Sequence, residues 1–146
     1  PAMLRYLNNN VNTKNSPNEN FAREFLELFT VMRGNQVCPG DYSNYTEDDI
    51  KTAARVLTGF TTADRTSEYL DPDTGIYRGR ARFNRHDTSD KTFSARFNHQ
   101  VIQGAEDEED MWRELQGFVD MIFGQFETAR NYARRLYRFL SIRNRH

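Results

Sequence analysis

The chain has 146 residues, a formal net charge of −1 and 13% aromatic residues, a composition that argues against disorder. Its length fits one domain with a hydrophobic core, and its balanced charge creates no overall field that would attract nucleic acid. No apolar run approaches the roughly 20 residues of a membrane span. Because Cys38 is the only cysteine, an internal disulfide and a cysteine-based metal site are excluded.

The first helix is expected over residues 1–8. Proline suits the first position of a helix, and Met3, Leu4 and Leu7 recur on one face. The asparagine-rich run over residues 8–16 follows and is expected to be a loop. The chain therefore begins with a short amphipathic helix, ahead of one with a more strongly marked start.

The second helix is expected to run from residue 17 to Gly34, which suits a helix end. Ser16 suits its cap, Pro17 its first position, and Glu19 the acidic position of a capping box. Helical spacing predicts a core stripe made of Phe21, Phe25, Leu28, Phe29 and Met32.

The third helix is expected to open at Thr46, a favourable cap residue. Its first turn carries Glu47, Asp48 and Asp49, and the positive end of the helix dipole favours such acids. Its buried face is predicted to comprise Ile50, Ala53, Ala54, Leu57 and Phe60.

Residues 61–106 are too many for a structureless loop inside a compact domain. Residues 76–77 and 81–83 suit extended backbone, and residues 91–93 are expected to pair back across residues 85–90. This middle segment is therefore predicted to contain a small β-hairpin.

The last part of the chain is expected to form two helices separated at Gly124. The acidic run over residues 106–110 suits the start of the fourth helix, and the two helices are expected to form an αα-hairpin. The stripe of the fourth helix is predicted to comprise Met111, Trp112, Leu115, Phe118, Val119, Ile122 and Phe123. The fifth helix is predicted to turn inward Ala129, Tyr132, Ala133, Leu136, Tyr137 and Leu140.

These elements together predict a mainly α fold, with about five helices and a long middle connection that contains the small β-hairpin. Residues 1–146 are interpreted as a single domain. The chain starts inside a helical pattern and stops just after an amphipathic helix, whereas natural domains usually have polar, frayed ends. We therefore expect it to be a fragment of a longer protein.

Glu24 is the charged residue that the second helix explains least. On a wheel turning about 100° per residue, it falls at the edge of the apolar stripe, between Leu28 and Val31. A carboxylate at such an edge needs a partner, either in a structural ion pair or in a functional site. The candidate partners are Arg55, His86 and Lys91. Arg23 and Glu27 fall roughly opposite the stripe and are interpreted as ordinary exposed positions.

His86 and Asp87 are the second polar candidate. A histidine beside an acid in a loop suits a general base, a metal ligand or a residue that holds the loop in place. No metal site is predicted, because the sequence lacks spacing of the H-E-x-x-H kind. A hard-cation site made of Glu24, Glu27, His86 and Asp87 is the alternative considered.

Several strings in the sequence carry a family resemblance. They are P-A-M-L-x-Y-L at residues 1–7, P-N-E-N-F-A-R-E at residues 17–24, A-R-x-L-T-G-F at residues 54–60, and Phe83, His86, Asp87 and Lys91 in order. The set resembles the bacterial domain of unknown function 1800 family over nearly the whole chain. Residues 35–44 depart from the pattern as an insertion-like stretch.

The resemblance implies a mostly helical fold, a longer parent protein and, for many members, export from the bacterial cytoplasm. It brings no established activity and no known cofactor. The matching polar positions are candidates for a site. The catalytic candidates are Glu24, Glu27, His86 and Asp87, and the binding candidates are Asn18, Asn20, Arg23, Arg55 and Lys91.

The favoured hypothesis is a helical structural or binding module of a secreted or envelope-associated bacterial protein, with the remainder of the parent chain as its partner. The alternative is a hydrolase-type enzyme in which Glu24 or Glu27 meets His86 beside a cleft, with or without a metal ion. Nucleic-acid binding is not expected, because the domain lacks net positive charge. The arginines on one face of the last helix suit a solvated face or a contact with that remainder.

Overall fold

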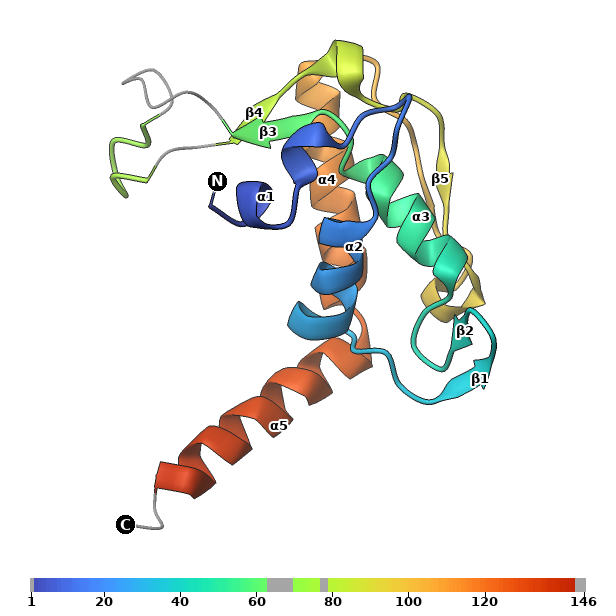
Figure 1. Ribbon diagram of the computed structural model, residues 1–146, viewed down its shortest axis with the longest axis vertical. Coiled ribbons are helices and arrows are strands. Elements are labelled where there is room, and N and C mark those ends of the chain that lie inside the picture. Colours follow the sequence, from blue (N-terminus) through green and yellow to red (C-terminus); the bar gives the residue numbers. More distant parts are fainter. Residues whose placement is uncertain (1, 63–69, 77–78, 144–146) are drawn as a thin grey trace.

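The computed structural model describes residues 2–62, 70–76 and 79–143. In these ranges the chain forms five α-helices and three small antiparallel strand pairs (Figure 1), which confirms the mainly α class. The α-helices are α1 (Ala2–Tyr6), α2 (Asn20–Glu24), α3 (Glu47–Val56), α4 (Glu108–Phe123) and α5 (Phe126–Arg143).

Short elements connect these helices. The strands pair as β1 (Gln36–Cys38) with β2 (Asp41–Tyr42), β3 (Phe60–Thr62) with β4 (Gly79–Ala81), and β5 (Lys91–Thr92) with β6 (Val101–Ile102). A π-helix, η2 (Phe25–Phe29), continues α2. The 3₁₀ turns are η1 (Asn9–Val11), η4 (Phe83–Arg85) and η5 (Ala95–Phe97).

The core lies where α2, α3 and α4 meet. The Phe25 and Phe93 rings each lie 5.8 Å from the ring of Phe118 in α4, measured between centroids. Each fully buried side chain of this size contributes about 1.5–3 kcal/mol through the area it removes from water. The fully or nearly fully buried members include Ala22, Leu26, Ile50, Ala53, Ala54, Phe97 and Ile122.

The second helix starts later than predicted. It begins at Asn20, whose backbone N–H donates to Asn18 Oδ1 at 3.0 Å. Glu19 makes no capping hydrogen bond, and its carboxylate instead pairs with Arg23 at 3.1 Å. The predicted start at Pro17 is wrong because the asparagine side chain offers the backbone a turn that competes with the helix.

The π-helix changes which side chains face the core. Its hydrogen bonds span five residues, so the positions after Glu24 are rotated relative to an ideal α-helical wheel. Leu26 is fully buried, and Phe21 and Phe25 pack against the core. The rest of the predicted stripe is wrong, because the structure exposes Leu28, Phe29 and Met32.

Helix α3 forms where it was predicted. Thr46 Oγ1 accepts a hydrogen bond from Asp49 N–H at 3.2 Å, and Asp49 Oδ2 accepts one from Thr46 N–H at 2.8 Å, which completes a capping box. Asp49 also accepts two hydrogen bonds from Ser94, so the start of α3 is tied to η5. The predicted buried face is confirmed, although Phe60 belongs to β3 rather than to the helix.

The middle segment pairs differently from the prediction. Strand β4 pairs with β3, directly after α3, and β5 pairs with β6. The middle segment therefore does contain a small antiparallel strand pair, β5 with β6, but neither pairing runs across residues 85–90, so the predicted partners are wrong. Ile76 lies in no described strand, and Tyr77 falls outside the described residues. Strands of two or three residues show no alternation, which leaves their partners unspecified by local pattern.

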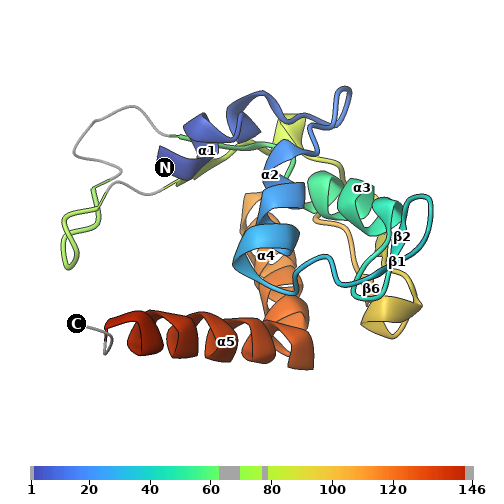
Figure 2. The ribbon, with the colours of Figure 1, turned by 60° about the horizontal axis from the view of Figure 1, so that its bottom comes forward.

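Helix α4 is confirmed, but the αα-hairpin is wrong. Asp107 caps α4 by accepting from Asp110 N–H at 2.8 Å, and the helix ends at Gly124. Figures 1 and 2 both show α5 leaving the body from the end of α4. The side chains predicted to turn inward on α5 are exposed, Leu136 by 60% and Tyr137 by 73%.

Candidate functional site

A buried group of three charged residues joins α4 to the middle segment. Glu114 of α4 places Oε2 3.0 Å from His86 Nε2 and Oε1 2.6 Å from Lys91 Nζ. All three side chains have 0% exposure. The backbone N–H of Ala105 also donates to Glu114 Oε2 at 3.1 Å. One carboxylate therefore holds three separate parts of the chain.

The surroundings of His86 and Lys91 fix their orientation. His86 Nδ1 lies 2.8 Å from the carbonyl oxygen of Thr58, so both ring nitrogens face oxygen acceptors. The Lys91 ammonium donates to the carbonyl oxygen of Asp87. Burial lowers the pKa of Lys91, and its hydrogen bond with Glu114 opposes that effect.

A second group fixes the loop that follows His86. Arg55 Nε donates to Asp87 Oδ2 at 2.8 Å, and Arg55 Nη2 donates to the carbonyl oxygen of Asp90 at 3.0 Å. Asp87 Oδ1 accepts from Ser89 N–H at 2.9 Å. Burial raises the pKa of Asp87, but the hydrogen bonds from Arg55 and Ser89 outweigh it and hold that pKa well below its ordinary range.

This second group makes the stability of the chain sensitive to acid. Asp87 binds a proton less readily when folded than when unfolded, so its contribution is complete above about pH 5 and is lost as the pH falls below about 4. We expect Asp87→Asn to lower the free energy of unfolding by about 1–2 kcal/mol at pH 7, with a smaller loss at pH 3. Urea unfolding followed by circular dichroism measures both.

Asp73→Asn is the matched control, because Asp73 lies exposed in a turn. Its unfolding free energy is expected to follow that of the parent chain at both pH values. A loss of equal size in Asp87→Asn at pH 7 and pH 3 would show that the Arg55 contact does not depend on the carboxylate charge.

A third group joins the end of α2 and the π-helix η2 to the start of α3. Arg23 donates to both oxygens of Glu47 at 2.8 and 2.7 Å. Glu27 accepts from Arg33 at 2.6 Å and from the Tyr45 hydroxyl at 2.5 Å. The hydrogen bond with Glu47 raises the pKa of Arg23, and burial together with Glu27 raises that of Tyr45. The interpretation of Arg23 and Glu27 as ordinary exposed positions is wrong, since the Glu27 side chain is only 17% exposed.

Glu24 has none of its predicted partners. Arg55 pairs with Asp87, while His86 and Lys91 pair with Glu114. Glu24 instead lines a groove between α1 and the α2–η2 helix, together with apolar side chains. The prediction failed because the core-facing side of α2 is centred on Ala22 and Leu26, so Glu24 faces away from the buried charges.

The chain was compared with known proteins. A family model described as "Protein of unknown function (DUF1800)" matches residues 1–145. The chain belongs to the DUF1800 family. The resemblance noted in the sequence is thereby confirmed, and no function comes with it. No curated protein and no solved structure matches the chain.

The family signature of this DUF1800 chain is structural over much of its length. Asn18 N–H donates to Asn12 Oδ1 at 2.9 Å, and Asn20 Nδ2 donates to the carbonyl oxygen of Leu7 at 3.2 Å. Both asparagines therefore join the turn before α2 to the preceding segment. Arg23 of the same string pairs with Glu19 and Glu47. Most polar members of the P-N-E-N-F-A-R-E string therefore hold neighbouring segments together, whereas Glu24 makes no such contact.

The four residues of the considered hard-cation site do not meet in this DUF1800 chain. His86 contacts Glu114, Asp87 contacts Arg55, and Glu27 contacts Arg33 and Tyr45. Among the described residues, no group of three or more His, Cys, Asp and Glu side chains is arranged to hold a metal ion. In the same part of the chain, none of the helices combines the length and apolar character that crossing a membrane requires.

Glu114 is the important residue that sequence reasoning missed. It lies three residues after Met111 and four before Phe118, on the apolar face of α4. The wheel argument that singled out Glu24 would have placed Glu114 among buried side chains as well. An acid inside an apolar stripe is therefore the signal that predicts a buried partner in this fold.

Proposed function

We propose that this chain is a helical binding module of a secreted or envelope-associated bacterial protein, and that α5 packs against another helix of the parent chain. The observation that carries the proposal is the apolar face of α5. Leu136, Phe139 and Leu140 are each more than half exposed. Each such side chain gains about 1.5–3 kcal/mol when a partner covers it completely.

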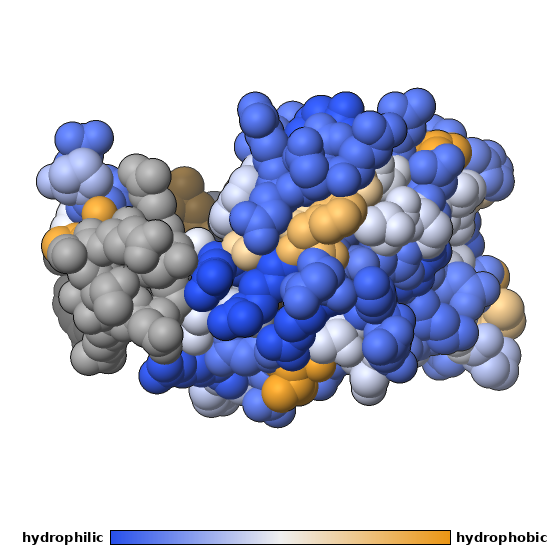
Figure 3. Space-filling model, turned by 90° about the horizontal axis from the view of Figure 1, so that it is seen from above, coloured by the Kyte–Doolittle hydropathy of each residue, from blue (hydrophilic) through white to orange (hydrophobic). Residues whose placement is uncertain are grey.

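The pattern on α5 is that of a helix built for one-sided packing. On a wheel, Ala129, Ala133, Leu136 and Leu140 fall on one side, and Arg130, Arg134 and Arg138 fall on the other. The two alanines allow a second helix to approach closely. The end of the body far from α5 has a mainly hydrophilic described surface (Figure 3). Large apolar side chains are exposed elsewhere too, but α5 gathers six of those in the described residues on one helix: Phe126, Tyr132, Leu136, Tyr137, Phe139 and Leu140.

The buried polar groups support a structural rather than a chemical role. His86, Lys91 and Glu114 are enclosed, so a substrate does not reach them in this arrangement. They hold the middle segment on α4, and the groups around Arg55 and Arg23 hold neighbouring loops. The hydrolase alternative required His86 beside Glu24 or Glu27, and no contact among the described residues favours it. Export to the envelope rests on the family resemblance.

The exposure of α5 can be tested by measuring the free energy of unfolding of a variant on its apolar face. We expect Leu136→Glu to change the free energy of unfolding by less than about 0.5 kcal/mol, because the side chain is already in water. The variant is also expected to show less self-association in size-exclusion chromatography, since it breaks the apolar face. Leu26→Ala, in the core, is the contrasting control and is expected to cost about 2–5 kcal/mol. A comparable loss in Leu136→Glu would place α5 against the body.

The proposal itself is tested in the full-length natural protein. A photo-crosslinking amino acid at position 136 is expected to form intrachain crosslinks to a helical segment outside residues 1–146. The matched control is the same amino acid at position 134, on the arginine side of α5. Crosslinking at 136 no stronger than at 134 would overturn the proposal.

A further inference from the structure

A groove of about 450 Å³ lies between α1 and the α2–η2 helix. Its described lining is mainly apolar and includes Tyr6, Leu28 and Phe29, all of them exposed. Glu24 is the one charged residue among these lining residues. A carboxylate therefore sits in a mainly apolar surface that has room for a side chain.

No described side chain neutralises Glu24. The chain forms no hydrogen bond or ion pair to its carboxylate within the described residues. The nearby arginines have other contacts: Arg5 Nε donates to Thr62 Oγ1 at 3.4 Å, Arg23 to Glu47, and Arg135 to the carbonyl oxygen of Leu28. A half-buried carboxylate without a cation remains available to a charge from outside.

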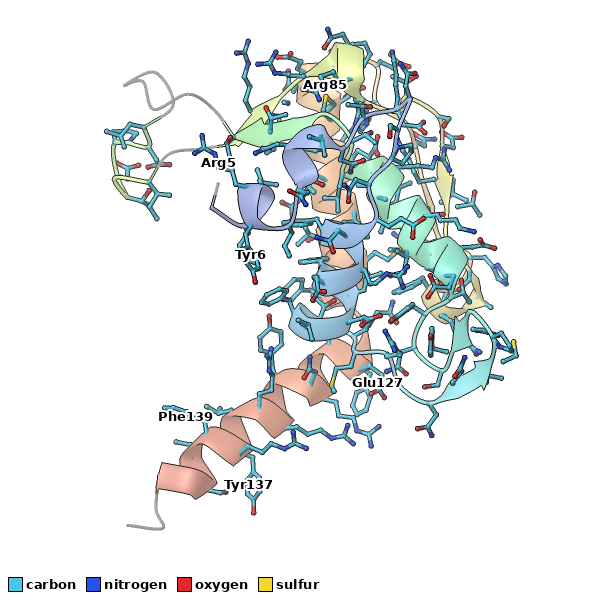
Figure 4. All side chains as sticks on the ribbon, in the orientation of Figure 1. Arg5, Tyr6, Arg85, Glu127, Tyr137 and Phe139 are labelled. Carbon is cyan, nitrogen blue, oxygen red and sulfur yellow. The ribbon has the colours of Figure 1, made fainter. Side chains whose placement is uncertain are left out.

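Hydrogen bonds connect α5 to the segment that carries one wall of the groove. Arg135 Nη1 donates to the carbonyl oxygen of Leu28 at 2.8 Å, and Asn131 Nδ2 donates to that of Thr30 at 2.7 Å. Leu28, which lines the groove, is thus bonded to the middle of α5, and Thr30, two residues further along the chain, is bonded to its first half. In Figure 4, Tyr6 points down from α1 and Phe139 points up from α5, toward the space between the two helices.

We infer that this groove receives a lysine or arginine side chain of the helix that packs on α5, and that Glu24 pairs with it. The inference rests on the proposed function and adds the charge that the partner helix carries. The rings of Tyr6 and Phe29 favour the same chemistry, because a cation is attracted to an aromatic face. The apolar remainder of the groove takes up the methylene stem of the basic side chain.

An anionic membrane surface is the competing occupant, because α5 is basic and amphipathic. Two observations favour a helix instead. The apolar groove and the apolar face of α5 lie on two elements that diverge (Figures 1 and 2), whereas a bilayer presents a plane. Glu24 would also repel anionic headgroups at the centre of that contact.

The test uses the full-length natural protein with the photo-crosslinking amino acid at position 6, inside the groove. The crosslinked peptide is expected to contain a lysine or arginine. Glu24→Lys is expected to lower the crosslink yield at position 6 about tenfold or more, because like charges oppose docking, and Glu24→Gln by a smaller factor. Reversing the charge of the identified basic residue in the Glu24→Lys background is expected to restore the yield.

The controls separate this inference from the proposed function. Glu106→Lys reverses an exposed acid elsewhere and is expected to leave the yield unchanged. Circular dichroism melting of each variant checks folding, which Glu24 does not support through any contact in the described residues. If crosslinking at 136 persists while Glu24→Lys leaves the yield at 6 unchanged, the inference fails and the proposed function stands. Crosslinks to lipid, with binding to vesicles of phosphatidylglycerol and phosphatidylcholine, would overturn both.

Discussion

Replacing Glu114 with Gln is expected to lower the free energy of unfolding by about 3–5 kcal/mol. The substitution keeps the shape of the side chain and removes the charge that balances the fully buried Lys91, while His86 also loses its carboxylate partner. Because a buried ammonium without a counter-charge is far more costly than one in a pair, the loss greatly exceeds that of an ordinary hydrogen bond. Urea unfolding at pH 7, followed by circular dichroism, measures the difference.

Two further variants show whether charge is the cause. Glu106→Gln makes the same chemical change at an exposed position and is expected to alter stability by less than about 0.5 kcal/mol. The double change Lys91→Met with Glu114→Leu removes both charges of the pair and is expected to recover most of the loss, since well-packed apolar side chains often replace a buried ion pair without cost. A loss below about 1 kcal/mol in Glu114→Gln would show that solvent reaches this group.

The sequence predicted which residues make buried polar contacts, but it did not predict which residue each of them contacts. His86, Lys91, Arg55 and Asp87 were all singled out, and all four lie in the two groups around the middle segment. Their partners were assigned wrongly, because a helical wheel gives the direction of a side chain but not the element that lies opposite. The actual partner of His86 is set by the packing of α4, which brings Glu114 to it across 28 residues of sequence.

The last helix, α5, was also predicted as an element, but its packing was not. Its amphipathic pattern predicted both its existence and its apolar face, and α5 extends over Phe126–Arg143. The prediction that this face turns inward is wrong, since amphipathicity requires a partner without specifying one. The exposure of α5 could therefore only be found in the structure, and it is the observation on which the proposed function rests.

The asparagine-rich run was the least informative part of the sequence and is among the most constrained parts of the fold. Low apolar content predicted a loop over residues 8–16, yet Asn9 and Asn12 are fully buried. Asn9 Nδ2 donates to the carbonyl oxygens of Leu57 and Phe60 at 3.1 and 3.0 Å. The last carbonyl groups of a helix lack partners within it. A segment that sequence reasoning treats as a connection thus satisfies the carbonyl groups at and after the end of α3.

Asn12→Ala is accordingly expected to lower the free energy of unfolding by about 2–4 kcal/mol, since each buried polar group left without a partner costs about 1–3 kcal/mol. Asn12 Nδ2 donates to the carbonyl oxygen of Ala54 at 2.9 Å and to Asn9 Oδ1 at 3.2 Å, and its Oδ1 accepts from Asn18 N–H at 2.9 Å, so the change removes the partner of three groups. Asn15→Ala, at an exposed position of the same run, is the matched control and is expected to stay within about 0.5 kcal/mol of the parent chain. Urea unfolding of the two variants measures the contrast, and equal stabilities would mean that water replaces Asn12 at the end of α3.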